Sequence, residues 1–298
     1  MKKTAVLIDG GYFIRRIDYF LRKHFPGHEL DSQQLVKIIW RIVKFHVEVP
    51  HGAHADREPL ELYRIYYYDC PPLDKQIKYP LPDGDNKTPS TKNFKTHAPN
   101  VLRNKLHEEL RKNRKTALRM GVLSNVGNWQ IKEHTLKKLL RNEIQWSELT
   151  NDDFYYEYKQ KAVDIKLGMD ITILAHEKLV DVIVLIAGDA DFVPAAKHAR
   201  IKGVDFILDP MNQQVPPSLA EHVDGVQSSN IVVAIADICR IVPTVKPDWW
   251  DDYIDRRKEK KLNRQKKTKS SKNDPKKKTL HSETSPGLSR GFTNPFQV

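Results

Sequence analysis

The segment VLIAGDADFVP, residues 184–194, constrains the fold more than any other stretch of the chain. An apolar run leads into Gly188 and then into two carboxylates, Asp189 and Asp191, that lie one residue apart. Near-continuous apolar runs are typical of strands buried on both faces of a parallel sheet. Pro194 suits the first turn of a helix, because its ring fixes φ and it has no N–H to leave unpaired. The segment therefore predicts a buried strand that delivers two carboxylates just before a helix.

Other parts of the chain repeat this alternation of strand and helix. Apolar or β-branched runs predict strands, and apolar residues at i, i+3 and i+4 predict helices. The expected strands are 4–10, 60–70, 116–124, 180–189 and 204–210, and the expected helices are 35–47, 160–177 and 194–203. Residues 228–242 fit a strand, a helix, or one after the other. Such alternation favours an α/β, Rossmann-like fold with a parallel sheet flanked by helices.

The composition divides the chain into a body and a tail. With 298 residues and 39% hydrophobic content, the chain is long enough to bury a sizeable core, which we expect over residues 1–254. Within this domain, residues 71–100 predict a long loop or lid, and residues 125–159 form an aromatic and polar insertion. Residues 255–298 contain hardly any apolar side chains, so we expect a disordered tail.

The positive charge is concentrated in that tail. Residues 255–298 hold 14 Lys and Arg against 4 Asp and Glu, whereas the rest of the chain holds 36 against 34. Such a block is either a solubilising extension or a segment that is attracted to phosphate backbones without regard to sequence. We favour contact with phosphates, because the body also shows features of phosphodiester chemistry.

Several classes of protein are excluded. No apolar run reaches about 18 residues, so no transmembrane helix is expected. Cys70 and Cys239 provide no disulfide framework and no CxxC metal site, and a cytoplasmic location is the default expectation. Glycine-rich dinucleotide and P-loop motifs are absent. We interpret His46, His51 and His54 as incidental histidines rather than zinc ligands. The sequence is compatible with a homo-oligomer.

Four aspartates are the candidate ligands of a metal ion. Asp9 ends the first strand, Asp189 and Asp191 follow the most apolar strand, and Asp164 lies on a helix. Ligands of open α/β sheets bind at the carboxyl ends of the strands, near the switch in strand order. Carboxylates that converge there repel one another unless a cation holds them or some are protonated. Oxygen ligands alone suit Mg²⁺ or Mn²⁺, which polarise a phosphoryl oxygen and activate water for phosphodiester cleavage.

Each carboxylate also has a simpler reading. Asp191 would cap the following helix, a role worth roughly 1 kcal/mol. Asp9, before two glycines, would be a turn residue. Asp164 and Asp170 would belong to a solvated helix face, since residues six apart lie about 120° apart around the axis.

The segments AVLIDGGYF, KAVDIKLGMDITILA, DVIVLIAGDADFVPAAKHARIKGVDFILDP and SLAEHVDGV resemble NYN-domain proteins, a branch of the PIN-like nuclease group. The resemblance covers roughly residues 1–242. It implies a parallel sheet flanked by helices, Mg²⁺ or Mn²⁺ as cofactor, and RNA as substrate.

The acidic positions of the family carry over to Asp9, Asp164, Asp189 and Asp191, as metal-binding and catalytic residues. Asp170 matches a further acidic position of the same helix. Many members of the family carry Asn soon after the first Asp, where this chain has Gly-Tyr-Phe at residues 11–13.

From these features we expect a metal-dependent ribonuclease acting on single-stranded RNA. Lys161, one helical turn before Asp164, is either a contact to a substrate phosphate or an ordinary solvated lysine. The alternative is a non-catalytic RNA-binding or regulatory module on the same fold. A phosphatase that uses Asp9 as phosphoryl acceptor ranks last, because the position two residues later is Gly11.

Overall fold

The computed structural model describes residues 1–48, 60–82 and 88–272. The chain forms two units, Met1–Val245 and Lys246–Val298. The first unit contains the sheet and the candidate site. Among the described residues, no helix is both long enough and apolar enough to cross a bilayer.

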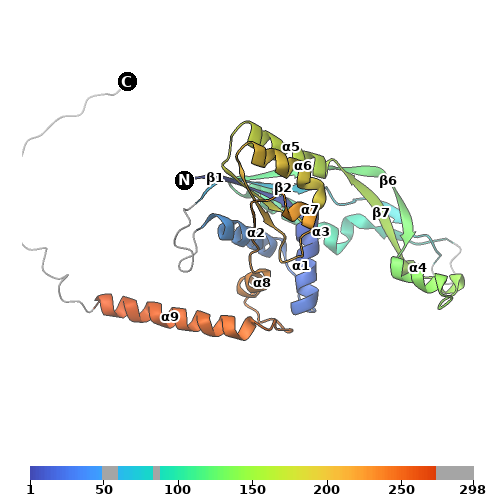
Figure 1. Cartoon of the computed structure of the whole chain (residues 1–298). Helices are drawn as coiled ribbons and strands as arrows, with labels where there is room; N and C mark the ends of the chain where they lie inside the picture. The colour runs from blue at the N-terminus through green and yellow to red at the C-terminus, as the bar shows by residue number, and fades with distance from the viewer. Residues whose placement is uncertain (49–59, 83–87, 273–298) are drawn as a thin grey trace, which may run out of the picture. The chain divides into compact units, whose positions relative to one another are not determined.

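A parallel sheet of six strands organises the first unit (Figure 1). In spatial order it runs β10 (Gly225–Val226), β9 (Asp205–Asp209), β8 (Val182–Ile186), β1 (Lys3–Asp9), β2 (Glu61–Asp69) and β5 (Thr116–Met120). From β1 the chain adds β2 and β5 on one side and β8, β9 and β10 on the other, so the order switches between β1 and β8. The expected parallel α/β fold is confirmed.

The ladder sets which strand ends meet. Ile8 of β1 pairs with Ile186 of β8 on one side and with Tyr67 of β2 on the other. Ile186 in turn pairs with Asp209 of β9. All five residues of β8 are buried, as expected for the most apolar strand. The residues that follow β1 and β8 therefore leave the sheet side by side, at the switch in strand order.

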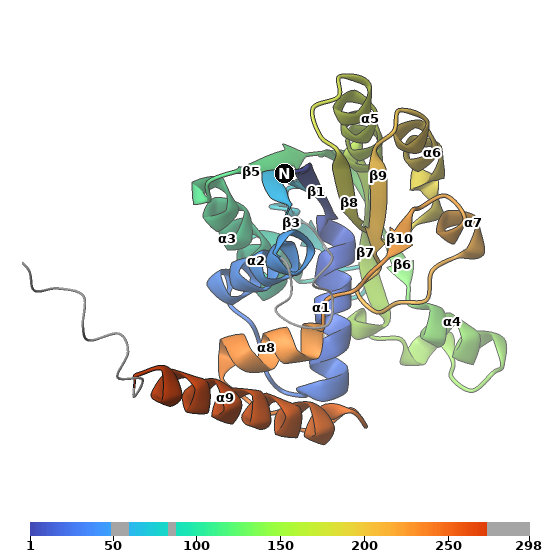
Figure 2. The same cartoon turned by 60° about the vertical axis from the view of Figure 1, so that its left-hand side comes forward.

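Helices cover both faces of the sheet (Figures 1 and 2). One face carries α5 (Val163–His176) and α6 (Val193–Ile201); α1 (Gly10–His24), α2 (Ser32–Val47), α3 (Ala98–Lys112) and α8 (Ile231–Cys239) gather on the other. Leu167 and Ile171 of α5 pack with Leu7, Leu185 and Leu208 of the sheet in one buried cluster. Burial of these apolar faces is the main force that fixes the strand ends in place.

Local signals explain most helix boundaries. Asp31 and Gln34 form a reciprocal capping box at the start of α2. After α6 the chain turns at Gly203, whose φ of 82° lies in the left-handed region. The ambiguous segment 228–242 contains α8, whose first turn is capped by Asn230 through a bond from the Val233 N–H. Helices α1 and α3 had not been expected.

The aromatic insertion forms an ordered projection, here called the β6–β7 arm (residues 122–161). It consists of β6 (Val122–Ile131), α4 (Glu133–Leu140) and β7 (Phe154–Lys161), with β6 and β7 antiparallel. Figure 1 shows the two strands extending away from the main sheet, with α4 at the far end. The strand expected over 116–124 is therefore two strands, β5 and β6, separated at Gly121.

The expected loop over 71–100 is also partly ordered. It contains the short hairpin of β3 (Gln76–Lys78) and β4 (Thr91–Asn93), followed by a 3-10 turn from Phe94. Aromatic rings join this segment to the arm: Tyr79 stacks on Trp129, and Phe94 and Trp129 both contact Tyr156. Residues 83–87 of the expected loop lie outside the described residues.

Helix α9 (Trp250–Lys272) spans the position at which a disordered tail had been expected to begin. Residues 255–272 are helical instead. Lys, Arg, Glu and Gln have high helix propensity, and Asp251 and Asp252 in the first turn suit the positive end of the helix dipole. Low apolar content argued against a buried core but not against a helix. Residues 273–298 of the expected tail lie outside the described residues.

Candidate acidic site

Aspartate stands at or just beyond the carboxyl end of four adjacent strands. Asp209 ends β9, Asp9 ends β1 and Asp69 ends β2, while Asp189 follows β8 after Ala187 and Gly188. Asp9 and Asp189 belong to the two central strands, and Asp69 and Asp209 to the strands that flank them. The surroundings of these four side chains divide them into two kinds.

Asp69 is completely buried and held by two hydrogen-bonding side chains of α3, Arg103 and His107. Its Oδ2 lies 2.7 Å from His107 Nε2 and accepts from Arg103 Nε at 2.8 Å, while Arg103 Nη2 bonds Oδ1. Burial disfavours the charged carboxylate, but the hydrogen bonds from His107 and Arg103 outweigh it and hold the pKa of Asp69 below its usual value. Asp69 is thus a structural carboxylate with its charge compensated inside the fold.

Asp209, on the other side of the two central strands, also has a buried side-chain partner. Its side chain is fully buried, and Oδ2 lies 2.9 Å from His46 Nε2 of α2. The Met211 N–H donates to Oδ1 at 2.8 Å. His46, which we had interpreted as incidental, is therefore a buried partner of a strand-end carboxylate; His51 and His54 lie outside the described residues.

Within the described residues, Asp9 has no comparable side-chain partner. It is half-buried, and its Oδ1 accepts a hydrogen bond of 2.9 Å from the Tyr12 N–H, which caps α1. Burial is the largest cause of the raised pKa of Asp9; the negative charges of Asp164 and Asp69 add to the increase, and Arg15 opposes it. Asp9 is both a helix cap, as its turn reading anticipated, and a carboxylate that costs energy to ionise.

Asp164 lies in the first turn of α5 and is exposed. The chain enters this helix through Ala162, whose φ of 65° lies in the left-handed region. Burial raises the pKa of Asp164, and the charges of Asp189 and then Asp191 raise it further. Asp164 is therefore close enough to the β8 carboxylates to feel their charge, and it also acts on Asp9.

Asp189 and Asp191 are both exposed. The Asp191 N–H donates to Asp189 Oδ1 at 3.1 Å, so Asp189 caps the 3-10 turn Ala190–Phe192. The capping role considered for Asp191 therefore belongs to Asp189. Because the caps on Asp9 and Asp189 both use Oδ1, each Oδ2 remains outside these bonds.

These four carboxylates have the donor chemistry of a Mg²⁺ or Mn²⁺ site. They supply oxygen ligands only, and the charge of Asp164 interacts unfavourably with Asp9 on one side and with Asp189 and Asp191 on the other. In the described part of the chain, however, no three His, Cys, Asp or Glu side chains are grouped so that they could already hold a metal ion. The residues fit a hard divalent cation by chemistry, and a bound ion would need to draw the side chains together.

Asp170 and Lys161 lie outside this group. Asp170 accepts bonds of 2.8 Å from Arg119 Nε and from the Tyr68 hydroxyl, so it ties α5 to the sheet. Lys161 is exposed at the end of β7, three residues before Asp164. The structure gives Asp170 a structural role and leaves Lys161 free of any described contact to the carboxylates.

Sequence reasoning missed a cation that acts on the acidic group. Arg15, on α1, lowers the pKa of both Asp9 and Asp164. Gly11 lies beside both groups: a Cβ at this position would lie 3.4 Å from Asp9 Oδ1 and 3.5 Å from Arg15 Nη1, which are ordinary contact distances. The spacing of Gly11 and Arg15 on one helix face was the available signal, but α1 itself had not been expected.

The residues that replace the family's Asn have a structural use. The Tyr12 hydroxyl donates to the Pro210 carbonyl at 2.6 Å, and this bond is buried. A Cβ at Gly188 would lie 2.5 Å from the Tyr12 ring, so the glycine after β8 allows the ring to pass. Phe13 is fully buried. Tyr12 thus links α1 to the end of β9 beside the acidic group.

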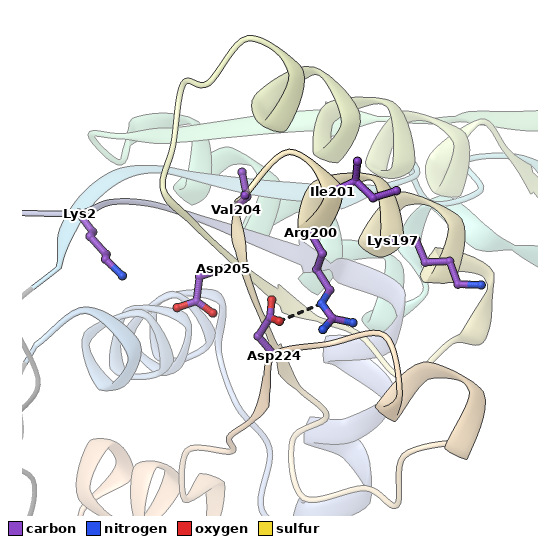
Figure 3. A pocket seen from close by; sticks show the side chains of 8 residues that line it. Lys2, Lys197, Arg200, Ile201, Val204, Asp205 and Asp224 are labelled. Atoms are coloured by element: carbon purple, nitrogen blue, oxygen red, sulfur yellow. Dashed lines mark hydrogen bonds and ion pairs between the residues drawn. The ribbon is translucent and has the colours of Figure 1, made fainter.

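A cleft lies at the opposite end of the strands (Figure 3). Its volume is about 720 Å³, and its lining includes Lys2 before β1 and Asp205 at the start of β9. Arg200 in its wall already donates to Asp224 at 2.8 Å, as Figure 3 shows. This cleft is separate from the acidic group, because parallel strands place their first and last residues at opposite edges of the sheet.

Three comparisons relate the chain to known proteins. The family model of the NYN domain matches residues 82–229, which include Asp164, Asp189 and Asp191 but not Asp9. An uncharacterised protein of Methanocaldococcus jannaschii is 27% identical over 110 residues, 37% of this chain and 43% of that protein. A large ribosomal subunit protein of Lupinus luteus is 27% identical over 187 residues, 60% of this chain and 80% of that protein.

Among solved structures, a protein of unknown function from Vibrio parahaemolyticus matches with a TM-score of 0.36 and 12% identity, over 77% of this chain and 94% of the other. The family match, the parallel sheet and the strand-end carboxylates point the same way. The chain is an NYN-domain protein of the PIN-like nuclease group.

Proposed function

We propose that this protein is a metal-dependent ribonuclease that hydrolyses phosphodiester bonds of single-stranded RNA. One observation carries the proposal: in the part of the chain that the structure describes, the flanking carboxylates bond buried His or Arg side chains, whereas Asp9 and Asp189 bond backbone N–H groups. Central carboxylates that lack such partners among the described residues suit a cation from solution, and this supports the proposed metal site.

In this proposal Asp9, Asp164, Asp189 and Asp191 would hold Mg²⁺ or Mn²⁺. The bound ion would activate water for attack on phosphorus and stabilise charge on the phosphoryl oxygens. The caps made by Asp9 and Asp189 orient their side chains through Oδ1 and leave Oδ2 for the ligand. Arg15 would contact a phosphate of the substrate, and Lys161 is a second candidate for such a contact.

RNA is the proposed substrate because the NYN domain belongs to a nuclease-type fold. The basic tail would add attraction to the phosphate backbone that weakens with salt. The two cysteines, Cys70 and Cys239, are both free, and we keep the cytoplasm as the proposed location.

The direct test is cleavage of labelled single-stranded RNA by the full chain in Mg²⁺ or Mn²⁺. Asp9→Asn and Asp189→Asn each remove a charge while keeping a side chain that caps helices well. We expect both to reduce cleavage by at least about 100-fold, the scale of losses at electrostatic catalytic groups. Asp205→Asn, at the opposite end of β9, is the matched control and should cleave like the parent. Unchanged cleavage in both site variants would refute the proposal.

One observation favours a second candidate, a non-catalytic RNA-binding module. Among the described residues, the His, Cys, Asp and Glu side chains are not grouped to hold a metal ion as they stand. That candidate predicts RNA binding that survives chelation, with no cleavage of any of several RNAs in Mg²⁺ or Mn²⁺. The same assay therefore separates the two functions.

A further inference from the structure

Two adjoining clefts lead away from the acidic group along α1. The first, of about 380 Å³, lies between α1 and β7; it is lined by Gly11, Ile14, Arg15, Arg103, Tyr155–Tyr158 and Gln160. The second, of about 600 Å³, continues between α1, α3 and the start of α2. Ile14, Arg103 and Tyr158 line both clefts, so they adjoin at these three residues.

The first cleft begins at the acidic group. Gly11 lies two residues after Asp9, and a Cβ at Gly11 would lie within 3.4 Å of Asp9 Oδ1. Arg15 lines the cleft and also lowers the pKa of Asp9 and Asp164. A ligand in this cleft would therefore pass the Arg15 guanidinium immediately before it reached the carboxylates.

Arg103 is held in the wall by its bonds to Asp69. These bonds use Nε and Nη2, so the buried carboxylate fixes the guanidinium and leaves Nη1 outside the pair. Tyr158 lines both clefts together with Arg103. A fixed guanidinium beside an aromatic ring suits phosphate contact, since little side-chain entropy is lost on binding.

The tyrosines of β7 are not equivalent. Tyr156 is committed to the arm: its ring contacts Phe94 and Trp129, and its hydroxyl donates to the Gly127 carbonyl at 2.8 Å. Tyr155 is 46% exposed, and Tyr158 is half-buried in the cleft wall. Neither ring is in contact with another aromatic ring of the described chain, so both are available to stack on a base.

We infer that this cleft, continued by the second one, binds a single-stranded polynucleotide and leads it to the acidic group. Tyr155 and Tyr158 stack on bases, and Arg15 and Arg103 contact phosphates. A base that stacks on a tyrosine ring must be unpaired, so we expect the clefts to exclude duplex nucleic acid. Glu157, in the same wall, repels phosphate and limits the affinity. The statement that the strand is led to the acidic group rests on the proposed function. The binding of the strand in the clefts does not depend on that function.

The test is fluorescence anisotropy of a labelled oligouridylate of about 12 nucleotides with the full chain in EDTA, where metal-dependent cleavage cannot occur. We expect Tyr155→Ala and Tyr158→Ala each to weaken binding by about tenfold, the scale of one lost stacking interaction. Tyr155→Phe and Tyr158→Phe keep the ring and should stay within about twofold of the parent. Trp146→Ala removes an exposed aromatic of the arm outside both clefts and should bind like the parent.

Glu157→Gln provides a variant in which folding is not at risk, because the side chain is exposed. We expect it to bind about threefold more tightly, as removal of one unfavourable charge near phosphates predicts. If oligothymidylate binds with the same loss of affinity in the Tyr→Ala variants, the site also accepts single-stranded DNA, and this result still supports binding in the clefts.

Parent-like binding by both Tyr→Ala variants would overturn the inference, as would equal affinity for a duplex or an equal loss in Trp146→Ala. These failures differ from failure of the proposed function. The proposed binding in the clefts is refuted when affinity in EDTA does not depend on the tyrosines. The nuclease proposal is refuted when cleavage does not depend on Asp9 and Asp189.

Discussion

Nε2 of His46 lies 2.9 Å from Oδ2 of Asp209, and almost no solvent reaches either side chain. Asp209 ends β9 in the same way that Asp9 ends β1, two strands away in the sheet. The partner, not the position, distinguishes a structural carboxylate from a candidate ligand. His46 on α2 pairs with Asp209, whereas Asp9 bonds only a backbone N–H in the part of the chain that the structure describes.

His46→Ala should destabilise the protein strongly. It leaves the buried Asp209 carboxylate without its side-chain hydrogen-bond partner, and an unsatisfied buried group of this kind costs at least about 1–3 kcal/mol. Urea denaturation followed by circular dichroism measures the change in the free energy of unfolding. An exposed substitution on the same helix, Lys44→Ala, should change stability by less than about 0.5 kcal/mol. Equal stability of the two variants would contradict the structural role of the pair.

Asp69 should make the protein sensitive to acid. Because its pKa is lowered in the folded state, its contribution is complete above the unfolded value of about 3.9 and is lost as pH falls through the lower folded pKa. Asp69→Asn should be less stable than the parent at pH 7, and the difference should shrink as pH falls below about 4. Denaturation midpoints across this pH range test the expectation; a difference independent of pH would contradict it.

Ionised Asp9 should destabilise the folded protein, in contrast to ionised Asp69. Its pKa is raised in the folded state, so ionisation costs stability as pH rises through the unfolded value of about 3.9 toward the folded pKa. In EDTA at pH 7, Asp9→Asn should therefore be more stable than the parent by on the order of 1 kcal/mol.

The gain should fall toward zero near pH 3, where the parent carboxyl is protonated as well. Addition of Mn²⁺ should stabilise the parent more than the variant, because a ligand that binds the folded state raises its stability. A variant that is less stable than the parent at pH 7 in EDTA would show that Asp9 is a structural carboxylate after all.

Gly188→Ala should damage the packing beside the acidic group. The new Cβ would lie 2.5 Å from the Tyr12 ring, and that ring is held by the buried bond from its hydroxyl to Pro210. We expect a loss of about 1–3 kcal/mol, typical of overpacking. Gly168→Ala, where a Cβ meets nothing within 4 Å, is the matched control and should be neutral or stabilising because it lies inside α5. Equal effects at the two glycines would contradict this account.

Strand positions and the acidic group could be predicted because each depends on local sequence. Apolar runs locate β1 and β8, and the register then places Asp9 and Asp189 on neighbouring strand ends. Asp164 was expected from its place on a helix and from the resemblance to a known family, and the structure shows that its charge acts on Asp9.

The compensation of Asp69 and Asp209 could not be predicted in this way. Their partners His107, Arg103 and His46 come from helices 34 to 163 residues away in sequence, and no local pattern encodes such pairing. Helix α1 was missed because its first residues, Gly10 and Gly11, have low helix propensity; close packing against Tyr67 requires a glycine at the first of them. The arm was missed because two antiparallel strands there pair with each other and not with the main sheet.

The central claim is that the carboxylates at the two middle strand ends share a divalent cation. Isothermal titration of the full chain with Mn²⁺ tests it most directly, with Asp9→Asn and Asp189→Asn as site variants and Asp205→Asn as control. The account predicts saturable binding by the parent and the control, and at least about tenfold weaker binding by each site variant. Absence of Mn²⁺ binding by the parent, or equal binding by all four proteins, would contradict it.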